Sequence, residues 1–125
     1  MDTRSARILV VDDDHKVAQS VARALRSEGY PVAVAYDGTQ ALDEIARFNP
    51  DLILLDLIMP KLDGFGVLAR LHTMKKPPPV IVVSAVGWRP PEFNGVISVI
   101  RKPFELSQLL ATIARVIEPV ARSAP

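Results

Sequence analysis

The sequence lacks cysteine, and it lacks any apolar run long enough to cross a bilayer. Without cysteine, the chain can form neither a disulfide-bonded scaffold nor a thiolate metal site. A membrane-spanning helix needs about 20 consecutive apolar residues, and residues 1–6 are polar, unlike a secretory signal. The formal net charge is only +1, which gives no reason to expect nucleic acid or a membrane as a partner. We therefore expect a cytoplasmic protein.

The length and composition indicate one globular domain. A chain of 125 residues buries about two-thirds of its unfolded surface, which is enough for one core. Its residues are 49% hydrophobic and 23% charged, a balance typical of folded and not of disordered proteins. We find no internal repeat. We assign residues 1–119 to the domain and residues 120–125 to a C-terminal tail or the start of a linker.

Four short apolar runs are each followed by charged or hydroxyl side chains. They are residues 8–11 before Asp12 and Asp13, residues 52–55 before Asp56, residues 80–83 before Ser84, and residues 96–100 shortly before Lys102. Runs of valine, isoleucine and leucine without polar alternation are typical of parallel strands buried on both faces. In open α/β sheets the functional crevice lies at the carboxyl ends of the strands. If these runs are neighbouring strands, three carboxylates, a hydroxyl and an ammonium group converge there.

Segments with helical spacing separate the strands, and residues 31–35 add a fifth strand. We expect Asp14 to cap the first helix, Gly29 to end it, and Asp37 to lead into the second. The expected buried positions are Val17, Val21 and Leu25, then Ala41, Leu42 and Ile45, then Phe65, Leu68 and Leu71 over residues 64–72, and finally Leu106, Leu109, Leu110, Ile113 and Ile117 over residues 105–117. The alternation predicts an α/β fold with a five-stranded, doubly wound parallel sheet. Two adjacent prolines within residues 87–95 predict a short or irregular fourth helix.

Convergence of Asp12, Asp13 and Asp56 would need a cation. Two carboxylates about 5 Å apart repel by roughly 3 kcal/mol at an effective dielectric constant of about 20. Mg²⁺ is suited to such a site because it prefers a few carboxylates together with waters and phosphate oxygens. Lys102 offers a second positive charge. Asp56 stands alone at the end of its strand, which makes it the best candidate for a nucleophile that forms an aspartyl phosphate.

Four motifs along the chain resemble the receiver domain of bacterial response regulators. The motifs are Val10-Val11-Asp12-Asp13-Asp14, Asp56-Leu57-Ile58-Met59-Pro60-Lys61-Leu62-Asp63-Gly64, Ser84-Ala85 and Lys102-Pro103-Phe104. Each is weak by itself, but all four occur in order at the ends of predicted strands. The resemblance covers residues 7–117 and implies the flavodoxin-like, CheY-like version of the doubly wound sheet.

The resemblance also implies a function for the acidic residues. Asp56 would accept a phosphoryl group from a phosphohistidine on a sensor histidine kinase or a histidine phosphotransfer protein. Asp12, Asp13 and Asp56 would hold Mg²⁺ together with the backbone carbonyl of Ile58. Such a domain is a stoichiometric phosphoacceptor, not a turnover enzyme. We expect it to be a monomer or weak dimer that signals to a downstream protein which the sequence does not identify.

The remaining motifs match the parts of a receiver domain that contact the phosphoryl group and report on it. Ser84 occupies the position of the switch hydroxyl, which turns towards the phosphoryl group. Lys102 occupies the position of the lysine that contacts the phosphoryl group. The resemblance implies a cis peptide bond between Lys102 and Pro103. Three positions depart from the pattern. Val99 replaces an aromatic residue, and the apolar Ile58, two residues after Asp56, favours slow self-dephosphorylation. Val86, two residues after Ser84, points the same way.

Two other functions remain open from the residues. A receiver-like module could bind protein partners independently of phosphorylation, which the absence of an aromatic residue at Val99 favours. A small phosphohydrolase could use Asp56 as a covalent nucleophile, but it would need a general acid nearby, and position 58 is isoleucine. His15 and His72 have no partner at ligand spacing, so we expect both to face solvent.

Overall fold

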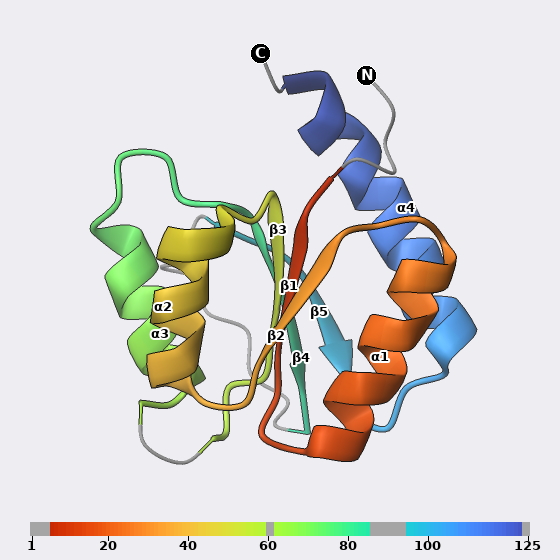
Figure 1. Cartoon of the computed structure of the whole chain (residues 1–125), viewed down its shortest axis with the longest axis horizontal. Coiled ribbons are helices and arrows are strands. Elements are labelled where there is room, and N and C mark those ends of the chain that lie inside the picture. Colours follow the sequence, from red (N-terminus) through yellow and green to blue (C-terminus); the bar gives the residue numbers. More distant parts are fainter. Residues whose placement is uncertain (1–5, 60–61, 86–94, 124–125) are drawn as a thin grey trace.

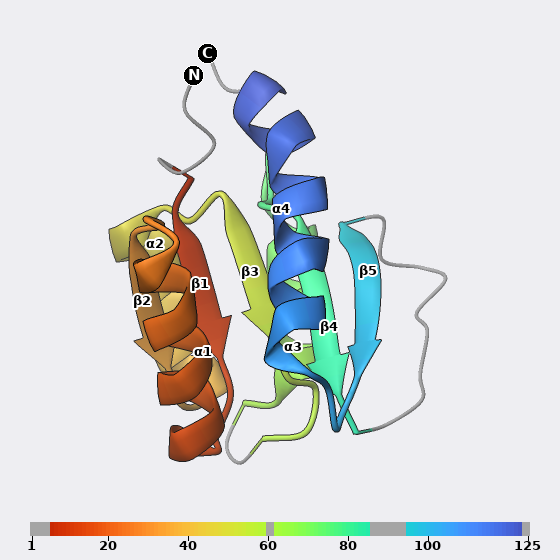
Figure 2. The ribbon, with the colours of Figure 1, turned by 90° about the vertical axis from the view of Figure 1, so that its right-hand side faces the viewer.

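Five parallel strands form one sheet, in the order β2-β1-β3-β4-β5, in the computed structural model of the chain. The structure describes residues 6–59, 62–85 and 95–123, with side chains up to residue 117. The strands are β1 (Ile8–Val11), β2 (Val32–Ala35), β3 (Leu52–Leu55), β4 (Val80–Ser84) and β5 (Val96–Arg101). Figure 2 shows all five pointing the same way. The predicted five-stranded parallel sheet is confirmed.

Helices cover both faces of the sheet. Helices α1 (His15–Ser27) and α4 (Leu106–Ser123) lie on one face, and α2 (Gly38–Phe48) and α3 (Gly64–His72) lie on the other (Figure 1). In β1, Ile8 and Val10 pack in the core beneath α1 and α4, whereas Leu9 and Val11 pack in the core beneath α2 and α3. Since successive strand residues alternate between faces, a strand covered on both sides must be apolar throughout.

The strand at the β5 edge departs from this pattern. The sequence predicted burial on both faces, but in β5 only Ile100 is buried, and Ile97 is exposed. The reason is its position: β5 has one strand neighbour, β4, instead of two. Topology, which the apolar run does not reveal, decides how much of a strand is buried.

Aspartate side chains begin three of the helices, two of them at Asp14 and Asp37, as predicted. The carboxylate of Asp14 accepts hydrogen bonds from the backbone N–H groups of Lys16 and Val17. Asp37 and Asp63 cap α2 and α3 in the same way, each accepting one backbone N–H. Each cap satisfies donors that the first helical turn leaves without a partner. As predicted, α1 ends just before Gly29, which has φ 97°.

Helix α4 differs from the prediction at both ends. It continues to Ser123 instead of ending at Ile117, because backbone hydrogen bonding can continue after an apolar stripe stops. Leu106 was predicted to be buried, but it is 37% exposed, since it is the first residue of the helix. The short or irregular fourth helix was predicted within residues 87–95, of which 87–94 lie outside the described residues. No helix in the described part of the chain is long and apolar enough to span a membrane.

Candidate functional site

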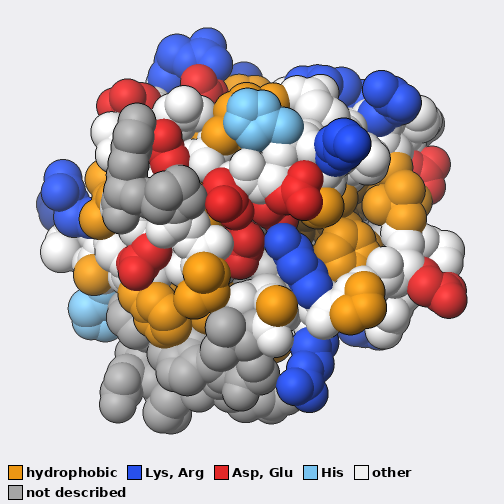
Figure 3. Space-filling view, turned by 90° about the horizontal axis from the view of Figure 1, so that it is seen from below, with side chains coloured by type: hydrophobic (Ala, Val, Ile, Leu, Met, Phe, Trp, Pro, Cys, Tyr) orange, Lys and Arg blue, Asp and Glu red, His pale blue; other side chains and the backbone are white. Residues whose placement is uncertain are grey.

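The carboxyl ends of the strands bring the predicted residues to one end of the molecule. Asp12 directly follows β1 and Asp56 directly follows β3, and these strands are neighbours, with Val11 paired to Leu55. The backbone N–H of Asp56 donates to the carbonyl of Val11 at 3.0 Å, which extends the pairing into the site. Viewed from this end, acidic side chains gather beside a basic one near the middle of the surface (Figure 3). The register of β1 and β3 therefore creates the acidic cluster.

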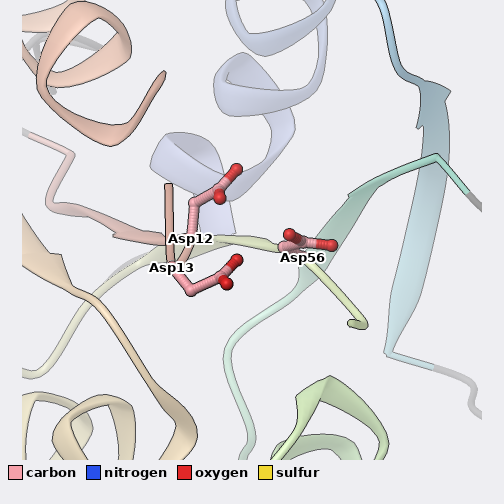
Figure 4. Close-up of side chains that lie close together, drawn as sticks. All are labelled: Asp12, Asp13 and Asp56. Atoms are coloured by element: carbon pink, nitrogen blue, oxygen red, sulfur yellow. The ribbon is translucent and has the colours of Figure 1, made fainter. Parts of the chain in front are cut away.

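The carboxylates of Asp12, Asp13 and Asp56 form a compact group, which we call the acidic triad. Each contributes one oxygen, and these oxygens all lie within 4.8 Å of one another. Figure 4 shows the three side chains clustered at the ends of β1 and β3. Asp12 and Asp56 are only 4% and 6% exposed, whereas Asp13 is exposed. The triad thus has two buried members, Asp12 and Asp56, and one solvent-facing member, Asp13.

Backbone groups hold two members of the triad. The N–H of Asp14 donates to Asp12 Oδ1 at 2.9 Å, and the N–H of Ile58 donates to Asp56 Oδ1 at 3.2 Å. No described residue donates a hydrogen bond to the carboxylate of Asp13. Within the described residues, two carboxylates of the triad are therefore oriented by backbone N–H groups, and that of Asp13 is not.

Lys102 joins the triad from the edge strand. Its Nζ lies 2.6 Å from Asp12 Oδ2 and 3.3 Å from Asp56 Oδ2, so one ammonium group bridges two carboxylates. The backbone N–H of Lys102 donates to the carbonyl of Ser84 at 3.0 Å, which fixes the chain as it leaves β5. The predicted cis peptide bond between Lys102 and Pro103 is present. The lysine side chain thus reaches the triad across the end of β4.

Burial and charge act in opposite directions on the ionisable groups of this site. Burial raises the pKa of Asp56, and nearby Asp12 adds to the effect, while the hydrogen bond from Ile58 and the charge of Lys102 oppose it. For Lys102, burial is the largest single influence and lowers the pKa, but Asp12 and Asp56 together outweigh it, so the pKa is raised. Lys102 therefore stays protonated, and the Asp56 carboxylate is less stable than an exposed one.

Ser84 and Ile58 differ in solvent exposure. Ser84 is the last residue of β4 and is completely buried, whereas Ile58, two residues after Asp56, is 56% exposed. Val99 is half-buried and packs against the core beneath α2 and α3. Val86 lies outside the described residues. The roles predicted for the Ser84 hydroxyl and the Ile58 carbonyl stay predictions.

Gly64 contributes to the site in a way that the sequence pattern did not reveal. A Cβ atom at this position would overlap the carbonyl oxygen of Asp56 and the Cα of Leu57. The N–H of Gly64 donates to the carbonyl of Leu57 at 2.9 Å. The start of α3 therefore packs directly on the backbone that carries Asp56, and only glycine permits that approach.

An aromatic pair at the start of α1 was also missed. His15 and His72 are exposed, as predicted, but the ring of His15 stacks on that of Tyr36, with centroids 3.8 Å apart and an interplanar angle of 16°. Tyr36 directly follows β2. The pair lies far apart in sequence, so no local signal could have predicted it.

Comparisons with known proteins agree with the geometry. A family model described as the response regulator receiver domain matches residues 8–114. The response regulator MprA of Mycobacterium bovis is 43% identical over 111 residues, which cover 86% of this chain and 48% of MprA. The chain therefore spans about half the length of the curated relatives it matches.

Solved receiver domains share the fold over nearly their whole length. The receiver domain of the Francisella response regulator 1452 is 31% identical, with a TM-score of 0.81, and the match covers 92% of this chain and 98% of that one. The response regulator TrrA of Thermotoga maritima, solved in complex with Mg²⁺ and BeF, is 28% identical with a TM-score of 0.78. That match covers 89% of this chain and 98% of TrrA.

Proposed function

This chain belongs to the response regulator receiver domain family, and from that premise we propose that Asp56 is its phosphoacceptor. The observation that carries the proposal is the bridge from Lys102 to Asp12 and Asp56 beside the exposed carboxylate of Asp13. The proposed nucleophile, a cation and further carboxylate oxygens thus lie together in one small site. Phosphoryl transfer needs little more than such positioning and charge neutralisation.

The proposed reaction forms one bond and breaks one. A carboxylate oxygen of Asp56 attacks the phosphorus of a phosphohistidine, the P–N bond breaks, and the imidazole leaves with the bonding electron pair and takes up a proton. The product is an acyl phosphate on Asp56. Burial raises the pKa of Asp56, so water stabilises its carboxylate less than it stabilises an exposed one. Each domain accepts one phosphoryl group, so it acts as a stoichiometric acceptor.

The acidic triad fits Mg²⁺. Its donors are all carboxylate oxygens, within 4.8 Å of one another, and the hard Mg²⁺ ion prefers oxygen ligands and retains several waters. The carboxylate of Asp13 is exposed to solvent, which suits an ion that keeps such waters. Asp12, Asp13, Asp56 and the backbone carbonyl of Ile58 would hold the ion. When bound, Mg²⁺ supplies charge neutralisation for the phosphoryl oxygens.

Lys102 and Ser84 have proposed roles after transfer. The Lys102 ammonium already contacts Asp56 Oδ2, so it is placed to donate to a phosphoryl oxygen attached there. The hydroxyl of Ser84, at the end of the strand between β3 and β5, would then turn towards the phosphoryl group. Val99 offers no aromatic ring to follow that movement, so the conformational signal would take another route to the downstream protein.

A groove beside the site is suited to the phosphodonor protein. It measures about 290 Å³ and lies between α1 and the start of α4, with Lys16, Val17, Ser20, Val21, Phe104 and Leu106 as its lining. Val17, Val21 and Phe104 also line a small cavity that contacts Asp12, so the groove lies close to one member of the triad. A sensor histidine kinase or histidine phosphotransfer protein would dock an apolar helix face here and present its phosphohistidine to Asp56.

Intact-mass analysis after incubation with acetyl phosphate and Mg²⁺ tests the proposal. We expect the gain of one phosphoryl group, and we expect no gain for Asp56→Asn or in EDTA. Absence of the adduct, with Mg²⁺ binding confirmed separately, would favour the alternative of a partner-binding module that acts without phosphate. Repeated turnover of a phosphate ester would instead indicate a phosphohydrolase.

A further inference from the structure

We infer that the stacked pair of His15 and Tyr36 is a positioning device that sets the affinity of the acidic triad for Mg²⁺. The inference rests on the proposed function, because it concerns the same metal site. His15 lies two residues after Asp13, and Tyr36 lies at the end of the neighbouring strand. The pair thus connects the segment that carries Asp13 to the framework of the sheet.

Tyr36 is fixed from three directions. Its ring stacks on His15 at a centroid distance of 3.8 Å, and its hydroxyl accepts a hydrogen bond from Nε2 of Gln19, one turn further along α1. Its backbone N–H donates to Oε1 of Gln40 in α2 at 2.9 Å. These contacts make Tyr36 a fixed point that links α1, the end of β2 and α2.

The segment of residues 12–15 is attached to β2 on both sides of Asp13. On one side, the backbone N–H of Asp12 donates to the carbonyl of Ala35 at 3.1 Å. On the other side, His15 stacks on Tyr36, the residue after Ala35. Asp13 lies between the two attachments, and no described residue bonds its carboxylate. Its position is therefore set by the backbone, which the two attachments hold.

Loss of the stack would remove one of the two attachments of this segment to β2 and leave the Asp14 cap of α1 in place. Mg²⁺ binding would then have to order the backbone around Asp13, and that ordering lowers the affinity. An aromatic pair contributes up to about a tenfold effect on an equilibrium constant. We therefore expect removal of the His15 ring to raise the Kd for Mg²⁺ by roughly 2- to 10-fold.

Isothermal titration of the full chain with Mg²⁺ tests the inference. We expect His15→Ala to raise the Kd, and His15→Phe, which restores a ring that can stack, to bring it back close to the wild-type value. His72→Ala, which removes the other exposed histidine at the far end of α3, should leave the Kd unchanged. Thermal unfolding in EDTA, measured for all three variants, separates a change at the metal site from a general loss of stability.

The outcomes are distinct. An unchanged Kd in His15→Ala would overturn the inference, and so would tighter binding in both His15 variants, which would indicate a charge effect. Equal weakening in His15→Ala and His15→Phe would also overturn it, because a ring would then not suffice. If the wild-type chain itself failed to bind Mg²⁺ while Asp13→Asn behaved identically, the proposed function would fail and not merely the role of the stack.

Discussion

Replacing Asp13 by asparagine should stabilise the metal-free protein, although most substitutions destabilise. The triad brings one oxygen from each of three carboxylates within 4.8 Å of the others, and Lys102 supplies the ammonium group that contacts it among the described residues. Asp13 is the exposed member, and no described residue bonds its carboxylate. Removing its charge therefore relieves repulsion from Asp12 and Asp56 without breaking a hydrogen bond within the described structure.

The magnitude follows from the geometry. At 4.8 Å, the upper limit of the separation between these oxygens, two unit charges repel by about 0.9 kcal/mol at the dielectric constant of water and by about 3.5 kcal/mol at an effective value of 20. Since Asp13 is exposed, the lower figure applies to each of its two repulsions, and attraction to Lys102 offsets part of the sum. We expect a net stabilisation of about 1 kcal/mol, which corresponds to a Tm increase of roughly 3–6 °C for a domain of this size.

Thermal unfolding in EDTA measures the stability of the metal-free chain, and thermal unfolding in Mg²⁺ measures the stabilisation by the ion. With Mg²⁺ at ten times its Kd, the wild-type chain should gain about 1.4 kcal/mol from binding, whereas Asp13→Asn should gain little. Asp43→Asn, which removes an exposed charge from α2, is the matched control and should change neither quantity. A lower Tm for Asp13→Asn in EDTA, or an undiminished response to Mg²⁺, would refute the reasoning.

Three further predictions concern the backbone, the lifetime of the acyl phosphate and the effect of pH. Gly64→Ala should lower the free energy of unfolding, measured by urea denaturation, by about 1–3 kcal/mol, because its Cβ would overlap the backbone at Asp56. Gly95→Ala is the control and should change this free energy little, because nothing lies within 4 Å of a Cβ there. Ile58→Asn should accelerate loss of phosphate, measured by intact mass over time, because an apolar side chain no longer screens the acyl phosphate, while Ile97→Asn at another exposed isoleucine should not; equal rates would contradict this. Burial raises the pKa of Asp56, so the folded state favours the protonated carboxyl group. The stability that this preference contributes is present at low pH and is lost as the pH rises through the raised pKa. Asp56→Asn should therefore be more stable than the wild type at neutral pH in EDTA, and this difference in stability should shrink in acid. A difference that grows in acid would contradict the prediction.

The sequence sufficed for the sheet because its central strands leave little choice. A run such as Ile8–Val11, apolar at every position, needs cover on both faces, and only helices on each side of a parallel sheet provide it. The helix starts were equally predictable, since Asp14, Asp37 and Asp63 act through local contacts with the next turn. These predictions depend on neighbours in the sequence.

Errors arose where burial depends on distant parts of the chain. Leu106 has the spacing of a buried residue, but it lies at the very start of α4 and lines a groove. Ile97 belongs to an apolar run that forms an edge strand. Hydrophobic periodicity predicts which face of an element is apolar, but it does not show where the covering elements end.

The candidate site also has parts that the sequence predicted and parts that depend on contacts between distant segments. Convergence of Asp12, Asp13 and Asp56 followed from their places after neighbouring strands. The bridging geometry of Lys102 did not, because it depends on a side chain that reaches across β4. The stack of His15 on Tyr36 and the close approach at Gly64 are contacts between segments that no local pattern connects.

Mapping the phosphorylated residue tests the central claim most directly. Borohydride reduces an aspartyl phosphate to homoserine, so treatment after phosphorylation by acetyl phosphate and Mg²⁺ marks the acceptor for peptide mass spectrometry. The account predicts homoserine at position 56 alone, and none in a sample treated with EDTA. Homoserine at position 12 or 13, or phosphorylation that leaves position 56 unmarked, would contradict it.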